Sequence, residues 1–173
     1  DWHERAKSLA IFSAFTEGVN LFSSFAVLLS FKMRNKLKGV GQIVEWSIRD
    51  ESMHSEAGCW LFRTLIKENP ELDTPDLKAA VTEAALLSLQ LELDFIEKVY
   101  ELGDLEGCSK EDLICFIKHR VNTKLGDLGY DPVVNGIDPN ALKRMKWFDS
   151  LSAGKQHTDF FANRVTNYSK GHL

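Results

Sequence analysis

The sequence has few of the residues that typify secreted or membrane-spanning proteins. Its 173 residues include three cysteines, and these form no C-x-x-C pair. Neither a disulfide framework nor a zinc knuckle is therefore expected, and a reducing, cytoplasmic location fits best. The longest run without a charged residue covers residues 18–31, whereas a helix that crosses a membrane needs about 20 residues. This run predicts a buried helix and no contact with a membrane.

Positive charge is scarce as well. The formal net charge is −4, and proteins that bind nucleic acid usually carry a basic stripe, so no nucleic-acid partner is expected. Apolar residues make up 44% of the chain, which is enough for a sizeable core, and the length suggests one domain over residues 1–173. The chain begins Asp-Trp-His-Glu, with neither an initiating methionine nor a signal peptide. We expect it to be a piece of a longer protein.

Only four prolines interrupt the chain, and the segments between them have the pattern of long helices. Apolar residues cover almost the whole circumference of the first segment, which indicates a helix buried on all sides. Thr74-Pro75 and Ser109 are typical helix starts, and no segment shows convincing strand alternation. The predicted class is all-α, a bundle of long helices over Glu4–Asn35, Gln42–Glu68, Thr74–Leu102 and Ser109–Leu125, with shorter helices at Ala141–Trp147 and Gln156–Tyr168. The first two should run antiparallel, since a short turn joins them.

Glu17 is the first residue that suggests chemistry, because it lies inside the most apolar helix of the chain. A buried carboxylate is costly unless it is paired or binds a metal. Two readings are open for Glu17 alone. It is either a solvated or salt-bridged residue at a helix edge, which is the commoner case, or a ligand inside the bundle.

The second helix offers a partner for Glu17. Glu51 and His54 are three residues apart, so both project from one helix face and can bind one metal ion. In helical carboxylate proteins, lone glutamates on two helices combine with Glu-x-x-His pairs on two others. Asp50 and Arg49 lie next to this pair and suggest hydrogen-bonded support for His54, or else a simple surface pair. A Glu-x-x-His pair alone often occurs by chance on an exposed face.

The sequence contains only this one Glu-x-x-His pair, so it holds half of such a two-metal site. Helix lengths also leave a difficulty in register. At a rise of about 1.5 Å per residue, Glu17 and Glu51 lie at levels about 13 Å apart when measured from the turn that joins the first two predicted helices. We nevertheless expect Glu17, Glu51 and His54 to converge.

Four stretches of the chain form a recognisable set: the Glu17-bearing stretch Phe15–Phe25, the run Ile48-Arg-Asp-Glu-Ser-Met-His54, the helix Phe116–Gly126 and the ending Thr158–Lys170. Together they resemble the carboxyl-terminal half of the small, radical-generating subunit of class I ribonucleotide reductase. The run with Arg-Asp-Glu-x-x-His is the most specific of them. The resemblance implies a ferritin-like long-helix bundle, of which this chain would form the carboxyl-terminal half.

The resemblance also implies roles for individual residues. Glu17, Glu51 and His54 would be ligands of a dinuclear iron centre, or of a manganese or mixed manganese–iron one, which reacts with oxygen. Asp50 and Tyr168 would carry the radical to the large subunit, where ribonucleotides are reduced, and residues 156–173 would lead to a flexible tail. Leu21 and Phe25, four and eight residues after Glu17, would share its helix face and line the apolar pocket around the radical.

The family's first half should supply a further carboxylate, a first Glu-x-x-His and usually a radical tyrosine, and these are missing here. We therefore expect the chain alone to be inactive and to expose an apolar face that a second copy covers. Two alternatives stay open. One is another ferritin-like di-iron protein that oxidises or stores iron or acts as an oxygenase or desaturase. The other is a helical partner protein whose Glu-x-x-His is accidental.

Overall fold

A computed structural model describes residues 1–152, and within this range all regular elements are helical. The predicted all-α class is confirmed. The predicted helix at Gln156–Tyr168 and the tail after it lie outside the described residues. The elements are α1 (Trp2–Ile11), the π-helix η1 (Phe12–Thr16), α2 (Phe22–Met33), α3 (Lys38–Glu68), the 3₁₀-helix η2 (Pro70–Leu72), α4 (Pro75–Tyr100), α5 (Lys110–Leu128), α6 (Pro139–Arg144) and α7 (Lys146–Ser152).

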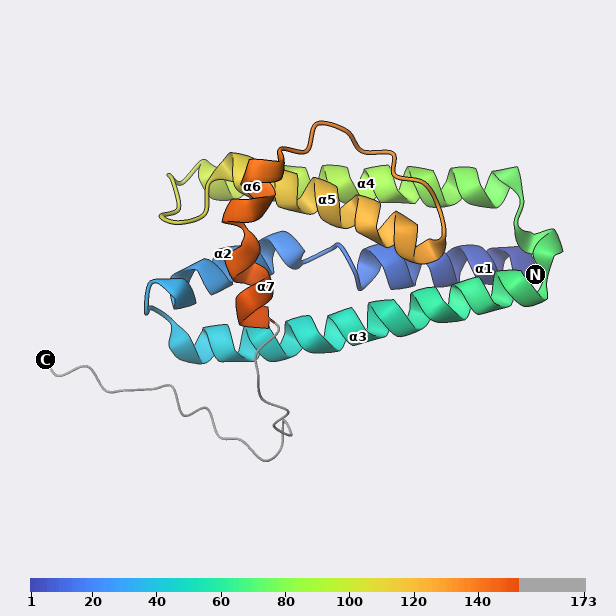
Figure 1. Ribbon diagram of the computed structural model, residues 1–173, viewed down its shortest axis with the longest axis horizontal. Helices are drawn as coiled ribbons and strands as arrows, with labels where there is room; N and C mark the ends of the chain where they lie inside the picture. The colour runs from blue at the N-terminus through green and yellow to red at the C-terminus, as the bar shows by residue number, and fades with distance from the viewer. Residues whose placement is uncertain (153–173) are drawn as a thin grey trace, which may run out of the picture.

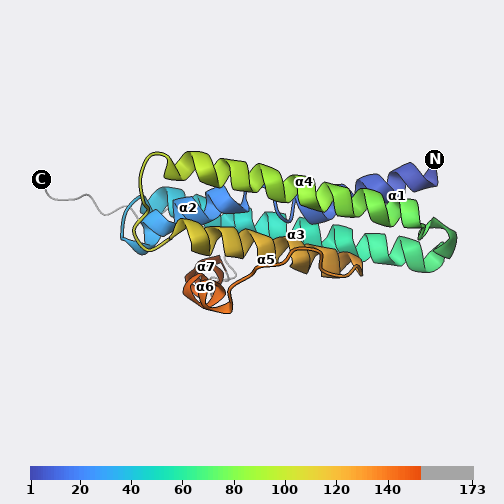
Figure 2. The same ribbon diagram turned by 90° about the horizontal axis from the view of Figure 1, so that it is seen from above.

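The helices form four rows that run along the long axis of the molecule (Figure 1). The first row is α1, η1 and α2, and it runs antiparallel to α3, as predicted; α4 and α5 follow in alternating directions (Figures 1 and 2). Neighbouring rows pack against each other, with α3 contacting α1, η1, α2 and α5. The short helices α6 and α7 lie outside the four rows, where α6 packs on α5, and α7 packs on α2 and α3.

Two helix starts follow from local capping residues, as the sequence predicts. The Thr74 hydroxyl accepts a hydrogen bond from the N–H of Leu77 at 3.1 Å, ahead of Pro75 in the first turn of α4. The Ser109 hydroxyl accepts one from the N–H of Asp112, also at 3.1 Å, at the start of α5. Each cap satisfies an N–H group that the first helical turn leaves without a partner.

The predicted start of the second helix at Gln42 is wrong, because α3 already begins at Lys38. Gly39 and Gly41 are in its first turn and are buried. A Cβ atom at Gly41 would lie 2.7 Å from the Lys32 side chain. Gly41 therefore lets α2 and α3 approach closely, and neither glycine interrupts the helix.

The prediction of one continuous first helix over Glu4–Asn35 is also wrong. The backbone widens into a π-helix at Phe12–Thr16, and residues 17–21 form a turn before α2 starts at Phe22. Leu21 has a φ of 74°, a left-handed conformation that costs a non-glycine residue roughly 1–2 kcal/mol. Nothing in the periodicity of the apolar residues predicts this break. Phe12 and Leu21 are exposed, so the first row is not buried on all sides.

Candidate metal centre

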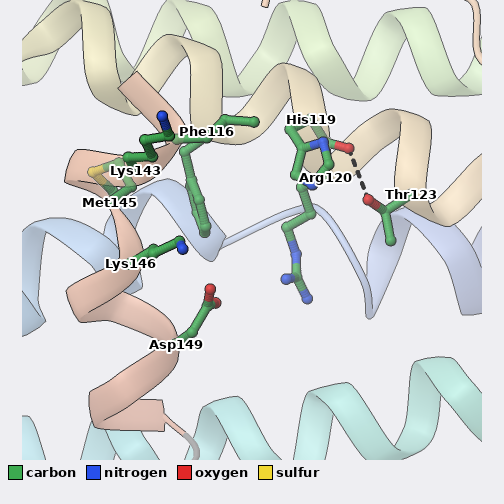
Figure 3. A pocket seen from close by; sticks show the side chains of 9 residues that line it. Phe116, His119, Arg120, Thr123, Lys143, Met145, Lys146 and Asp149 are labelled. Carbon is green, nitrogen blue, oxygen red and sulfur yellow. Dashed lines mark hydrogen bonds between the residues drawn. The ribbon is translucent and has the colours of Figure 1, made fainter. Parts of the chain in front are cut away.

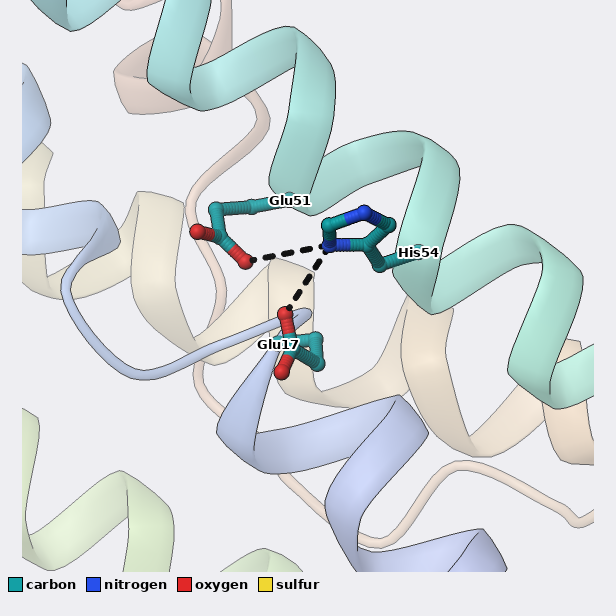
Figure 4. Close-up of side chains that lie close together, drawn as sticks. All are labelled: Glu17, Glu51 and His54. Atoms are coloured by element: carbon teal, nitrogen blue, oxygen red, sulfur yellow. Dashed lines mark ion pairs between the residues drawn. The ribbon is translucent and has the colours of Figure 1, made fainter.

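Glu17, Glu51 and His54 converge where the first row meets the middle of α3, despite the mismatch in register that helix lengths predicted. Glu17 follows directly after the π-helix η1, and the other two project from α3 (Figure 4). The Nδ1 atom of His54 lies 3.6 Å from Oε2 of Glu17 and 3.9 Å from Oε2 of Glu51. One ligand atom from each residue lies within 4.8 Å of the other two. The cluster opens to solvent on one side, since the exposed fraction of the side chain rises from 16% for Glu17 to 30% for Glu51 and 58% for His54.

These three side chains fit a metal ion in both spacing and charge. Metal–oxygen and metal–nitrogen bonds are roughly 2 Å long, so donors on one ion lie up to about 4 Å apart, and the observed spacing needs only small side-chain rotations. Three effects raise the pKa of the Glu51 carboxyl. In order of size they are a hydrogen bond with Glu17, the loss of water around the carboxyl, and the negative charge of Glu17, while His54 lowers the pKa. Two carboxylates held this close are stabilised by a cation.

The break in the first row removes the 13 Å mismatch in register. Because α3 starts at Lys38, Glu51 lies 13 residues, or about 20 Å, along it. On the other side of the turn, α2 spans only Phe22–Met33, about 17 Å, and Glu17 stands just beyond it across the unwound segment. The distances of Glu17 and Glu51 from the turn between α2 and α3, measured along the helices, then agree to within a few ångströms.

Glycines allow the close approach of η1 and α3 beside the cluster. A Cβ atom at Gly18 would lie 2.6 Å from the Ser55 hydroxyl, and one at Gly58 would overlap the Ser13 side chain. Sequence reasoning missed both residues. The available signal was the spacing, since Gly58 stands one helical turn after His54 and Gly18 directly follows Glu17.

The other predicted site residues are not brought into this cluster. Asp50 is exposed beside Glu51 and adds a small upward contribution to the pKa of Glu51. Arg49 donates a hydrogen bond to the backbone oxygen of Ser152 at the end of α7. Tyr168 lies outside the described residues. The roles in radical transfer given to Asp50 and Tyr168 stay predictions.

The spacing argument for Leu21 and Phe25 is wrong, because the chain is not helical between Glu17 and Leu21. Leu21 is 57% exposed. Phe25 is partly buried and packs edge-on against Phe22, with ring centroids 5.3 Å apart. A face shared by residues four apart requires an uninterrupted helix.

A separate cavity of about 470 Å³ lies between α5 and the α6–α7 pair (Figure 3). It contains none of the three clustered residues and is lined by Phe116, His119, Arg120, Thr123, Leu142, Lys143, Met145, Lys146 and Asp149. Within residues 1–152, no helix has the length and apolar character needed to cross a membrane.

A bundle of long helices that brings a lone glutamate and a Glu-x-x-His pair together defines a ferritin-like carboxylate protein. A family model described as "Ribonucleotide reductase, small chain" matches residues 2–140. The chain belongs to this family, and the ferritin-like fold inferred from the resemblance is confirmed.

The relatives that the chain matches carry the same family name. It is 36% identical to the probable ribonucleoside-diphosphate reductase small subunit of Invertebrate iridescent virus 3, over 98% of this chain and 44% of the viral protein. It is 26% identical to the ribonucleoside-diphosphate reductase subunit beta of Chlamydia pneumoniae, over 94% and 45% of the two chains. A crystal structure from Bacillus halodurans, assigned to the class I ribonucleotide reductases, aligns with a TM-score of 0.72 at 26% identity and covers 82% of this chain and 49% of that one. The chain thus spans about half the length of these relatives.

Proposed function

We propose that this chain forms one half of the metal-binding core of a ribonucleoside-diphosphate reductase small subunit, namely the carboxyl-terminal half. The observation that carries the proposal is the convergence of Glu17, Glu51 and His54, the ligand types that the sequence resemblance implies. A dinuclear iron, manganese or mixed centre, when bound, supplies the oxygen-dependent oxidising equivalent that starts nucleotide reduction in a large subunit. The match to reductase small subunits favours this function over iron storage, oxygenase or desaturase activity.

Each ligand residue has a distinct task in this proposal. Glu17 and Glu51 would hold the ions through carboxylate oxygens, whose negative charge would compensate that of the ions. His54 points Nδ1 at both carboxylates, so a neutral imidazole protonated on Nε2 would leave Nδ1 free to bind. The half-buried position of Glu17 limits water on its side of the site.

The remaining ligands lie, in this proposal, outside this chain, on another polypeptide. A pair of ions needs more donors than the three that the described residues bring together. Exposed apolar residues on α3, Ile43 and Leu61, lie on the same helix face as His54, 11 residues before it and seven after it. A second copy of the chain or a complementary half would cover this face, and the open side of the site with it. The free cysteines at positions 59, 108 and 115 suit a cytoplasmic location.

Metal titration of the full chain tests the proposal. We expect the chain to bind Co²⁺ or Fe²⁺, and Glu17→Gln, Glu51→Gln and His54→Ala each to weaken binding at least tenfold. The matched control is Glu56→Gln, which removes an exposed carboxylate of α3 that is not part of the cluster. Unchanged affinity in all three ligand variants would contradict the proposal. Sedimentation at micromolar concentration, with and without metal, would show whether two copies complete the site.

We also propose that Asp50 and Tyr168 carry the radical toward the large subunit. In a reconstituted small subunit with its large subunit, Tyr168→Phe should abolish nucleotide reduction and leave metal loading intact, because a phenol can release a proton and an electron and a phenyl ring cannot. Asp50→Asn should disturb metal loading as well, since Asp50 adjoins Glu51. Full reductase activity of Tyr168→Phe would refute the relay.

A further inference from the structure

The break between η1 and α2 leaves backbone groups without the partners that a continuous helix would provide. In such a helix, the N–H groups of Leu21 and Ser23 and the C=O of Gly18 would each be paired with backbone four residues away. Here the N–H of Phe22 donates instead to the C=O of Val19 at 3.1 Å. A buried backbone group without a partner costs about as much as a lost hydrogen bond, so the break requires partners from elsewhere in the fold.

Glu92 provides partners for the two N–H groups. Its side chain reaches the break from α4 and is almost fully buried, with 7% of the residue exposed. One carboxylate oxygen accepts from the N–H of Leu21 at 3.1 Å, and the other accepts from the N–H of Ser23 at 2.9 Å and from its hydroxyl at 2.5 Å. Leu21, the residue before α2, has no side-chain cap of its own to offer. Glu92 thus caps α2 from a different helix.

Arg120 provides the partner for the carbonyl group. It reaches down from α5 toward the unwound segment (Figure 3) and donates from Nε to the C=O of Gly18. Its guanidinium carbon also lies 3.2 Å from the centre of the Phe22 ring. The loss of water lowers the pKa of Arg120 to about 9, so the side chain keeps its positive charge at neutral pH.

The two charges match the two helix ends that meet at the break. A negative group is favourable at a helix N-terminus and a positive group at a C-terminus, and Glu92 and Arg120 occupy these places at the start of α2 and the end of η1. Gly18, which Arg120 holds, directly follows Glu17. We propose that Glu92 and Arg120 are positioning residues that stabilise the helix break and thereby hold Glu17 at the metal site; this inference rests on the proposed function.

Cobalt titration of the full chain, combined with amide hydrogen exchange of the metal-free chain, tests this role. Glu92→Gln replaces one of the two acceptor oxygens by an NH₂ group. This NH₂ group must then face an N–H or O–H donor at the break. We expect exchange at Leu21 and Ser23 to accelerate roughly tenfold and the dissociation constant for Co²⁺ to rise about tenfold or more, as for other residues that orient metal ligands.

Asp112→Asn is the matched control. Asp112 is another buried carboxylate, and its bonds to Arg144 at 2.6–3.0 Å join α5 to α6, outside the metal site. This variant should lower the melting temperature but change the Co²⁺ dissociation constant less than twofold. If Glu92 only stabilised the fold, Glu92→Gln and Asp112→Asn would bind Co²⁺ with the same affinity. That result would overturn the proposal.

Milder variants keep the test decisive if Glu92→Gln does not fold. Ser23→Ala removes one of the three bonds to Glu92, and Arg120→Met keeps a side chain over Phe22 while removing the bond to Gly18. Each should weaken Co²⁺ binding by a smaller factor in the same direction. If the unaltered chain binds no Co²⁺, the proposed function fails. The stabilisation of the helix break by Glu92 and Arg120 is then judged on amide exchange alone, and unchanged protection at Leu21 and Ser23 in these variants refutes it.

Discussion

The two stretches of chain that supply the candidate ligands are built in opposite ways. Glu51 and His54 lie inside α3, an uninterrupted helix of 31 residues, and their relative position follows from helical spacing alone. Glu17 lies at the end of a π-helix, directly before an unwound turn, and its position depends on residues far away in the sequence. A site assembled from both kinds of backbone combines a rigid pair with a ligand whose placement the surrounding helices determine. Short π-helical segments such as η1 are frequent at functional sites.

Gly58 offers the strongest test of how closely the two stretches must approach. Gly58→Ala should destabilise the protein by about 2–3 kcal/mol, because the added methyl group overlaps Ser13 in η1 and overpacking of a core costs about this much. Gly126→Ala in α5 is the control, since nothing lies within 4 Å of its Cβ position and alanine favours a helix by up to about 1 kcal/mol. Urea denaturation should give opposite signs for the two variants. A Ser13→Gly change should partly rescue Gly58→Ala; equal effects at both glycines would contradict the close approach.

The same contrast explains how much of the molecule the sequence predicts. The helices α4 and α5 with their caps at Thr74 and Ser109, the body of α3 and the Glu51–His54 pair all follow from local patterns. The helix break does not, because it is stabilised by Glu92 and Arg120, 71 and 102 residues away from their partners. One signal was available, since Glu92 interrupts the buried apolar stripe of α4 just as Glu17 interrupts the first apolar segment.

The pH dependence of stability has opposite signs at the metal cluster and at the Asp112–Arg144 pair of α5. In the metal-free chain the pKa of Glu51 is raised by Glu17, so stability falls as pH rises from the unfolded value, about 4.5, through the folded one. Asp112 in α5 has a lowered pKa because of its hydrogen bonds with Arg144, so it stabilises the fold above its ordinary value of 3.8 and this contribution is lost as pH falls through the folded value.

Chemical denaturation with a chelator present, at pH 7 and near pH 4, measures this difference. At pH 7, Asp112→Asn should destabilise the chain by about 1 kcal/mol, and Glu51→Gln should leave it unchanged or more stable. The effect of Glu51→Gln should shrink toward pH 4, whereas that of Asp112→Asn should largely persist there, because the folded pKa of Asp112 lies below 3.8. Two variants that shift stability in the same direction at pH 7 would show that the carboxylates of the metal cluster do not repel each other.

The smallest expected effect concerns the backbone of the break itself. Leu21 has a φ of 74° and an exposed side chain, so truncation to alanine removes few contacts but keeps the strain of a Cβ atom. Leu21→Gly removes this strain, worth roughly 1 kcal/mol, against the greater flexibility that glycine gives the unfolded chain. We expect Leu21→Gly to be more stable than Leu21→Ala by up to about 1 kcal/mol in urea denaturation, the reverse of the order in an ordinary helix. If the bond from the Leu21 N–H to Glu92 imposes this φ, the difference should shrink when both are measured together with Glu92→Gln. An unchanged difference there would mean that packing within the first row, and not the remote carboxylate, sets the conformation of the break.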